Sequence, residues 1–161
     1  MSGLGEPWDT PTTIRYNEGA EVGYRWFAKT RATPLFAFGH GLSYTSFTYS
    51  DLKVTGGKTV TASFTVRNAA QRPGADVPQL YLTDAAGDRR MRLLGFERVE
   101  LRPGESRRVT LGADPRLLAR FDAPAGQWRI TNGVYQVAVG RSAVDLILTG
   151  QARLSAQLFG H

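Results

Sequence analysis

The sequence predicts an all-β sandwich from about residue 47 to residue 158, preceded by an extended N-terminal arm. Apolar and polar residues alternate with period 2 in several short segments, as in strands that bury one face. Turn signals separate these segments, and the 161 residues include 18 glycines and 8 prolines. Seven or eight short antiparallel strands with such regular turns are typical of a sandwich.

The arm is expected to comprise residues 1–46, and the sandwich domain residues 47–161. The first 50 residues hold 10 of the 17 aromatic residues but show no clean periodicity. Turn signals such as Thr33-Pro34 and Gly39-His40-Gly41 interrupt them. A long aromatic loop without regular structure is unusual in a compact domain. We therefore expect an extended segment whose rings pack against a neighbouring surface.

The first predicted strands follow the arm directly. Residues 59–67 place Phe64 and Val66 on one face and Thr, Ser and Arg on the other. A second strand spans about residues 77–83, and Pro78 indicates that it starts late or lies at an edge. Residues 84–88 form a turn, and a third strand runs from Arg92 to Leu101 with a bulge at Gly95.

The second half of the chain continues this pattern. A tight turn at residues 102–105 precedes a strand over residues 106–111. Asp114 is expected to cap one helical turn that begins at Pro115. Short strands are predicted over residues 127–130 and 133–139, joined as a hairpin by Asn132-Gly133, with further strand pattern over residues 145–158. The predicted core comprises Val60, Phe64, Val66, Leu80, Leu82, Val109, Tyr135 and Val137.

Composition narrows the possible functions. The chain has no cysteine, which excludes disulfides, Cys-ligated metals and thiol catalysis. No apolar run is long enough to span a membrane, and residues 1–5 have no leader pattern, so no membrane partner and no signal peptide are expected. The net charge is +6, but the arginines are scattered along the sequence, so no nucleic-acid partner is expected.

Several phrases, taken in order, resemble the C-terminal part of family 3 glycoside hydrolases. They include Tyr16-Asn17-Glu18-Gly19, Val22-Gly23-Tyr24-Arg25-Trp26-Phe27, Pro34-Leu35-Phe36-Ala37-Phe38-Gly39-His40-Gly41-Leu42-Ser43-Tyr44-Thr45, Leu94-Gly95-Phe96-Glu97-Arg98-Val99 and Gly133-Val134-Tyr135. The likeness covers roughly residues 14–148. It implies a fibronectin type III (immunoglobulin-like) sandwich, with the arm coming from the end of an α/β sandwich domain.

The resemblance also implies a β-glucosidase-like parent that hydrolyses terminal β-linked glucosides or related sugars with retention. Such enzymes use an Asp nucleophile on a (β/α)₈ barrel and an acid/base on a middle domain. The family's Ser-Asp-Trp stretch with the nucleophile does not occur here. The chain alone is therefore expected to be no enzyme, and its parent to be periplasmic or secreted.

The candidate contact residues for carbohydrate or for another domain are Glu18, Tyr24, Arg25, Trp26 and His40. Glu18 could instead bond the local backbone or Arg25, and His40 could simply hold a turn. The only other histidine is His161, so no metal site and no cofactor are expected.

The sequence therefore favours a non-catalytic structural module that packs against the catalytic domains of a family 3 glycoside hydrolase, in the same or a separate chain. The alternatives are an autonomous carbohydrate- or protein-binding module, or an accessory chain of a split glycosidase. A further hypothesis is a homodimer formed through the arm, because exposed edge strands and a long hinge favour exchange between copies.

Overall fold

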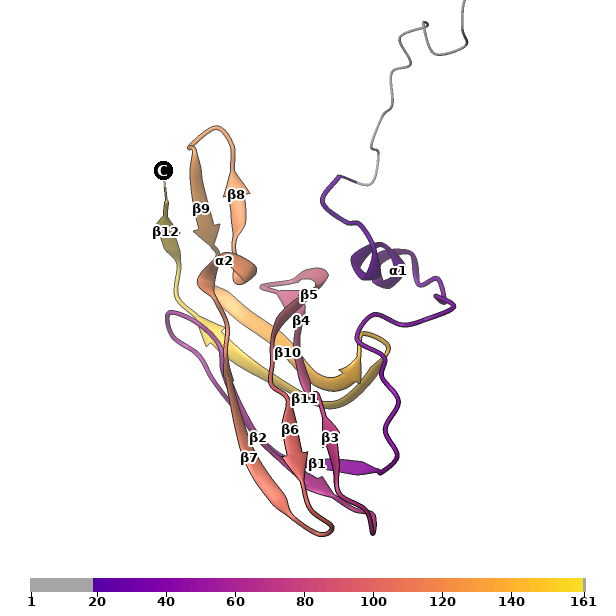
Figure 1. Ribbon diagram of the computed structural model, residues 1–161. Coiled ribbons are helices and arrows are strands. Elements are labelled where there is room, and N and C mark those ends of the chain that lie inside the picture. Colours follow the sequence, from indigo (N-terminus) through magenta and orange to yellow (C-terminus); the bar gives the residue numbers. More distant parts are fainter. Residues whose placement is uncertain (1–18, 161) are drawn as a thin grey trace, which may run out of the picture.

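The computed structural model describes residues 19–160, and two antiparallel sheets face each other in it (Figure 1). The three-stranded sheet has the order β1-β2-β7, with β1 Phe47–Thr55, β2 Thr61–Asn68 and β7 Ser106–Gly112. The four-stranded sheet has the order β11-β10-β4-β5, with β11 Asp145–Leu154, β10 Gly133–Ser142, β4 Gln79–Ala85 and β5 Asp88–Phe96. These seven strands confirm the predicted sandwich.

Two smaller sheets complete the β structure. One pairs β3 Gly74–Asp76 with β6 Val99–Leu101. The other has the order β12-β9-β8, with β12 Gln157–Phe159, β9 Gln127–Ile130 and β8 Arg120–Asp122, and it extends from one end of the sandwich (Figure 1). No helix among residues 19–160 is long and apolar enough to cross a membrane.

The core between the two main sheets follows the predicted alternation. In β2, Ala62, Phe64 and Val66 are fully buried while the residues between them are partly exposed. The whole predicted core is buried: Val60, Phe64, Val66, Leu80, Leu82, Val109, Tyr135 and Val137. Burial of one face per strand is what drives the two sheets together.

Strand β4 departs from the expected half-buried pattern. Its residues Gln79 to Leu82 are all buried, so both of its faces are covered. One face meets the core, and part of the arm lies over the other, as described below. The strand begins at Gln79, directly after Pro78, as the proline predicts.

The turns explain where the predicted strand boundaries fail. Ala86 and Gly87 both have positive φ, 54° and 90°, so β4 and β5 form a two-residue hairpin, and β5 starts at Asp88 rather than Arg92. Residue pairing shifts between Leu80–Gly95 and Tyr81–Leu93, which confirms the expected bulge. The predicted strand over 92–101 is wrong as one element, since β5 ends at Phe96 and β6 is in another sheet.

The hairpin predicted at Asn132-Gly133 is also wrong. β9 pairs with β8 and β12, whereas β10 pairs with β4 and β11. Both edges of β10 are thus occupied by longer strands, so the turn leads from one sheet into another. The helical turn α2 Pro115–Leu118 is confirmed, with the Asp114 carboxylate accepting a hydrogen bond from the Arg116 N–H at 2.8 Å.

The arm is not extended throughout, because residues 24–30 form the helix α1 Tyr24–Thr30. Gly23 precedes it with φ 60°, and the left-handed Arg31 ends it with its N–H donating to the Phe27 carbonyl. A helix of seven residues is marginal on its own in water. Packing against β5 therefore stabilises it, which the sequence pattern of the arm does not reveal.

Candidate functional site

Tyr24 fixes helix α1 on the four-stranded sheet. Its hydroxyl accepts a hydrogen bond from the Leu93 N–H of β5 at 2.9 Å. Its ring stacks on Phe38 of the arm at 4.4 Å and meets Tyr81 of β4 edge-on at 6.2 Å. Burial under these rings raises the pKa of the Tyr81 phenol, with a smaller contribution from Tyr24. The arm therefore covers the outer face of β4.

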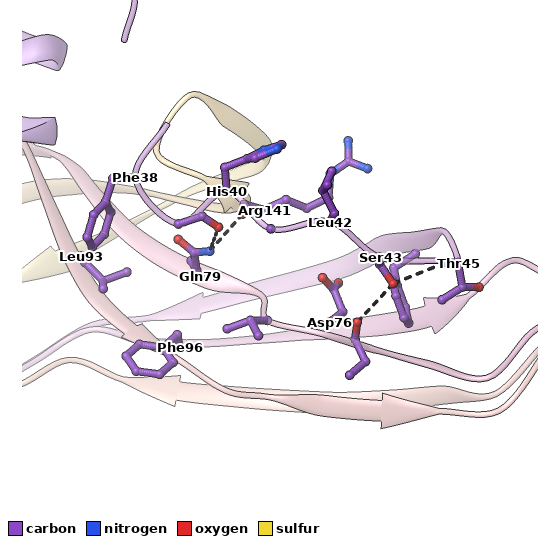
Figure 2. Close-up of a pocket in the computed structure, with 15 residues that line it drawn as sticks. Phe38, His40, Leu42, Ser43, Thr45, Asp76, Gln79, Leu93, Phe96 and Arg141 are labelled. Carbon is purple, nitrogen blue, oxygen red and sulfur yellow. Dashed lines mark hydrogen bonds between the residues drawn. The ribbon is translucent and has the colours of Figure 1, made fainter. Parts of the chain in front are cut away.

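Gln79 holds the loop that follows the helix. Its side-chain amide donates to the carbonyls of Gly39 and Arg141, each at 2.9 Å (Figure 2). Its amide oxygen accepts a hydrogen bond from the Tyr81 hydroxyl. Gly39 has φ 80°, and a Cβ there would lie 2.0 Å from the Gln79 amide oxygen. The loop thus needs glycine at this position, both for its conformation and for space.

A cleft of about 530 Å³ lies between this loop and the sheets (Figure 2). Phe38, Leu93 and Phe96 supply apolar surface, and polar groups surround them. The polar lining comprises His40, Ser43, Thr45, Asp76, Gln79 and Arg141. Such a mixture of aromatic and polar groups can hold a polar ligand or a side chain of a partner.

The charged groups of the cleft are partly engaged within the chain. The Tyr49 hydroxyl donates to the Asp76 carboxylate at 2.7 Å, and burial, followed by the nearby Asp76 charge, raises the pKa of Tyr49. Arg141 pairs with Asp145 at 2.8 Å. Among the described residues that line the cleft, Asp76 is the only carboxylate. Retaining hydrolysis requires two carboxyl groups at the sugar, and this lining supplies one.

The outer surface of the arm is apolar and exposed. We call Trp26, Phe27, Leu35, Phe36, Leu42 and Tyr44 the arm face. Leu35 and Tyr44 are 98% and 97% exposed, although both are large and apolar. Phe27 and Phe36 also line a cavity of about 470 Å³ between α1 and the following loop. Monomeric proteins rarely expose a large contiguous apolar patch, so the arm face is a candidate interaction surface.

The predicted contact residues occupy different parts of this region. Tyr24 is half-buried where helix α1 contacts the four-stranded sheet, and Trp26 is 43% exposed on the arm face. Arg25 donates to the Ala20 carbonyl at 3.2 Å and lies over the Tyr24 ring. His40 lines the cleft, and its backbone N–H donates a hydrogen bond to the Ala37 carbonyl at 3.1 Å. Glu18 lies outside the described residues.

Sequence reasoning missed two features. Gln79 is central to the loop, but a glutamine in a strand gives no signal of the contacts it makes in the fold. The arginines are scattered along the sequence, but folding places Arg25 and Arg31 in one cleft with Arg89 and Arg90 of β5. Folding brings together residues that are 58 or more positions apart in the chain. Within residues 19–160, no cluster of three potential metal ligands is found.

Comparisons with known proteins identify the domain. A family model for the fibronectin type III-like domain matches residues 76–143. Thermostable β-glucosidase B of Acetivibrio thermocellus is 36% identical, over 89% of this chain and 20% of its own length. Probable β-glucosidase M of Neosartorya fischeri is 40% identical, over 86% of this chain and 21% of its own length.

Solved structures agree with these relatives. β-Glucosidase 3B from Thermotoga neapolitana superposes with a TM-score of 0.84 and 36% identity, over 97% of this chain and 22% of that one. The family 3 β-glucosidase of Bifidobacterium adolescentis gives 0.81 and 32%, over 88% and 22%. The chain thus spans about a fifth of the length of the relatives it matches, in which catalytic domains lie elsewhere. It carries a fibronectin type III-like domain and corresponds to the part of family 3 β-glucosidases that contains this domain.

Proposed function

We propose that the chain is a non-catalytic module of a β-glucosidase that hydrolyses terminal β-linked glucosides with retention, and that its arm face packs against the catalytic domains. The single observation that carries this proposal is the exposure of the arm face. The rest of the arm is anchored by Tyr24 and Gln79. Anchoring one side of a segment while the other side stays apolar and exposed is the arrangement expected at a domain interface.

The two sides of the arm have separate roles in this proposal. Tyr24 and Gln79 hold the arm on the sandwich, and Trp26, Phe36 and Leu42 present apolar surface outward. Of the predicted contact residues, Trp26 would pack at the interface and His40 would face it from the cleft, and Glu18 and Arg25 remain proposed contacts. The module would thereby fix the sandwich relative to the catalytic domains without supplying a catalytic group.

A chimaeric enzyme tests this role. The matched fifth of the A. thermocellus β-glucosidase is replaced by this chain, and thermal unfolding and aryl β-glucoside hydrolysis are measured. The double variant Phe36→Asp/Leu42→Asp should lower the Tm of the chimaera by several degrees, because it buries charge at the interface. Ile147→Asp, on β11, is the control, since Ile147 is 37% exposed outside the arm face. Equal effects of the two changes would refute the interface.

We further propose that the isolated chain forms homodimers through the same arm face. The described part of the arm, residues 19–46, folds back on its own sandwich and contains no strand, so the contact would join two apolar faces rather than exchange a strand. Sedimentation over a concentration range should show association, which Phe36→Asp/Leu42→Asp abolishes. If the chain stays monomeric at high micromolar concentration, the dimer is refuted. The interface with the catalytic domains is tested separately, by the chimaera.

A further inference from the structure

A second, chemically different site lies on the other side of helix α1. A cavity of about 200 Å³ separates the helix from β5. Five cationic side chains line it: Arg25, Lys29, Arg31, Arg89 and Arg90. Glu21 is the one carboxylate in the lining that residues 19–160 provide. We call this the basic cleft. The basic cleft gathers five cationic residues in one place, although the whole chain has a net charge of only +6.

The cations of the basic cleft have few anionic partners. Among the described residues, Arg90 alone of the five forms an ion pair, with Asp88 at 3.6 Å, and Asp88 also pairs with Arg120. Arg25 and Lys29 have no carboxylate within 4 Å in that part of the chain. Most of the positive charge at the cleft is therefore not neutralised by the fold that the structure describes.

Arg90 is itself largely engaged within the fold. Its side chain is only 7% exposed, and its Nε lies 3.6 Å from the Asp88 carboxylate. The other end of its guanidinium donates to the Leu118 carbonyl of α2 at 2.8 Å, which fixes its orientation. Among the described residues, the unpaired positive charge at the cleft is therefore that of Arg25, Lys29, Arg31 and Arg89.

The electrostatics of the neighbouring arginines agree with this geometry. Burial lowers the pKa of Arg90, and the nearby Arg92 charge lowers it further. Burial likewise lowers the pKa of Arg92, with Arg25 as the next cause. Arg25 of the helix and Arg92 of the strand thus repel each other, and Glu21 partly offsets this repulsion. An anion bound beside Arg25 would reduce it further.

We propose that the basic cleft binds a small oxyanion, such as phosphate or a carboxylate group. Guanidinium groups from two elements can each direct paired N–H donors at the oxygens of such an anion. Arg25 and Lys29 approach from the helix, and Arg89 approaches from β5. The cavity has room for one small oxyanion with some water. Binding would also link α1 to β5 and so hold the arm in place.

Backbone amide NMR of the 161-residue chain tests the proposal. Sodium phosphate is titrated at constant ionic strength, with sodium chloride as compensation, and sodium D-glucuronate is titrated in a second series. We expect saturable shifts confined to residues 24–31 and 89–92, with dissociation constants in the millimolar range, for at least one of the two anions. The series that saturates identifies whether phosphate or carboxylate is preferred.

Charge-neutral variants localise the binding. Arg25→Gln/Lys29→Gln and, separately, Arg89→Gln should weaken binding at least fivefold, and two variants on different elements guard against a local folding defect. Arg67→Gln is the matched control for Arg89→Gln, because Arg67 is exposed on β2 in the other sheet and its replacement also removes one positive charge. Shifts that stay linear and spread over the surface with both anions would overturn the proposal. So would equal weakening by Arg67→Gln. Neither result depends on the arm face.

Discussion

Replacing Tyr24 by alanine should release the arm from the sandwich. Half-burial of the ring removes roughly 100 Å² of apolar area from water, which corresponds to about 2.5 kcal/mol. Stacking on Phe38 adds about 1 kcal/mol, and the hydrogen bond from the Leu93 N–H adds about 1 kcal/mol. Because the site is at the surface and can partly collapse, we expect Tyr24→Ala to lower the free energy of unfolding by about 3–4 kcal/mol. Tyr24→Phe, which loses only the hydrogen bond, should cost about 1 kcal/mol.

Urea unfolding measures the change in stability, and limited trypsin digestion measures release of the arm. Lys29 and Arg31 provide cleavage sites in α1 and at its end, and Tyr24→Ala should expose them well below the global unfolding midpoint. Tyr44→Ala is the matched control, since Tyr44 is an arm tyrosine that is 97% exposed, and it should change stability by less than about 0.5 kcal/mol. A loss of less than about 1 kcal/mol in the free energy of unfolding for Tyr24→Ala, with unchanged digestion, would refute the claim that Tyr24 holds the arm on the sandwich.

Phe64→Ala should cost roughly 3–5 kcal/mol in urea unfolding, because the ring is fully buried between the sheets, and a cost below about 1 kcal/mol would mean that the register of β2 is wrong. Gly39→Ala should destabilise the loop by at least about 1 kcal/mol, since φ is 80° and the new Cβ would strike Gln79, and unchanged amide exchange around residue 39 would contradict this. Tyr49 has its pKa raised by burial and by Asp76, so the unfolded phenol ionises first. Its contribution to stability is therefore complete below pH 10 and is lost as the pH rises above it, a decline that Tyr49→Phe should reduce. The chain alone should give only background hydrolysis of aryl β-glucosides, and activity that survives repurification and disappears with one carboxylate substitution would disprove this.

Local patterns predicted the parts of the fold that depend on neighbouring residues. The alternation around Phe64 placed β2 correctly, and the Asp114-Pro115 pair placed α2, because strand burial and helix capping are set within a few positions. The hairpin at Asn132-Gly133 failed because strand pairing is decided elsewhere. A favourable turn sequence cannot pair β9 with β10 once β4 and β11 occupy both edges of β10.

The arm illustrates a second limit. Helix α1 is too short to form from its own sequence, so only its contacts with β5 reveal it. The basic cleft has the same origin, since Arg25 and Arg90 are separated in the chain by the rest of the arm and the four strands β1 to β4. The sequence identifies Tyr24, Trp26 and His40 as candidates only because they lie in stretches that resemble the family. The structure is needed to show that Tyr24 contacts the sheet, Trp26 lies on the arm face and His40 lines the cleft.

Hydrogen–deuterium exchange of the chimaeric β-glucosidase, compared with the isolated chain at a concentration where it is monomeric, tests the central claim most directly. The claim is that the arm face packs against catalytic domains. Backbone amides of residues 33–44 should exchange markedly more slowly in the chimaera, while those of β2 and β7 in the three-stranded sheet should be unchanged. Equal exchange of residues 33–44 in the two proteins would contradict the account.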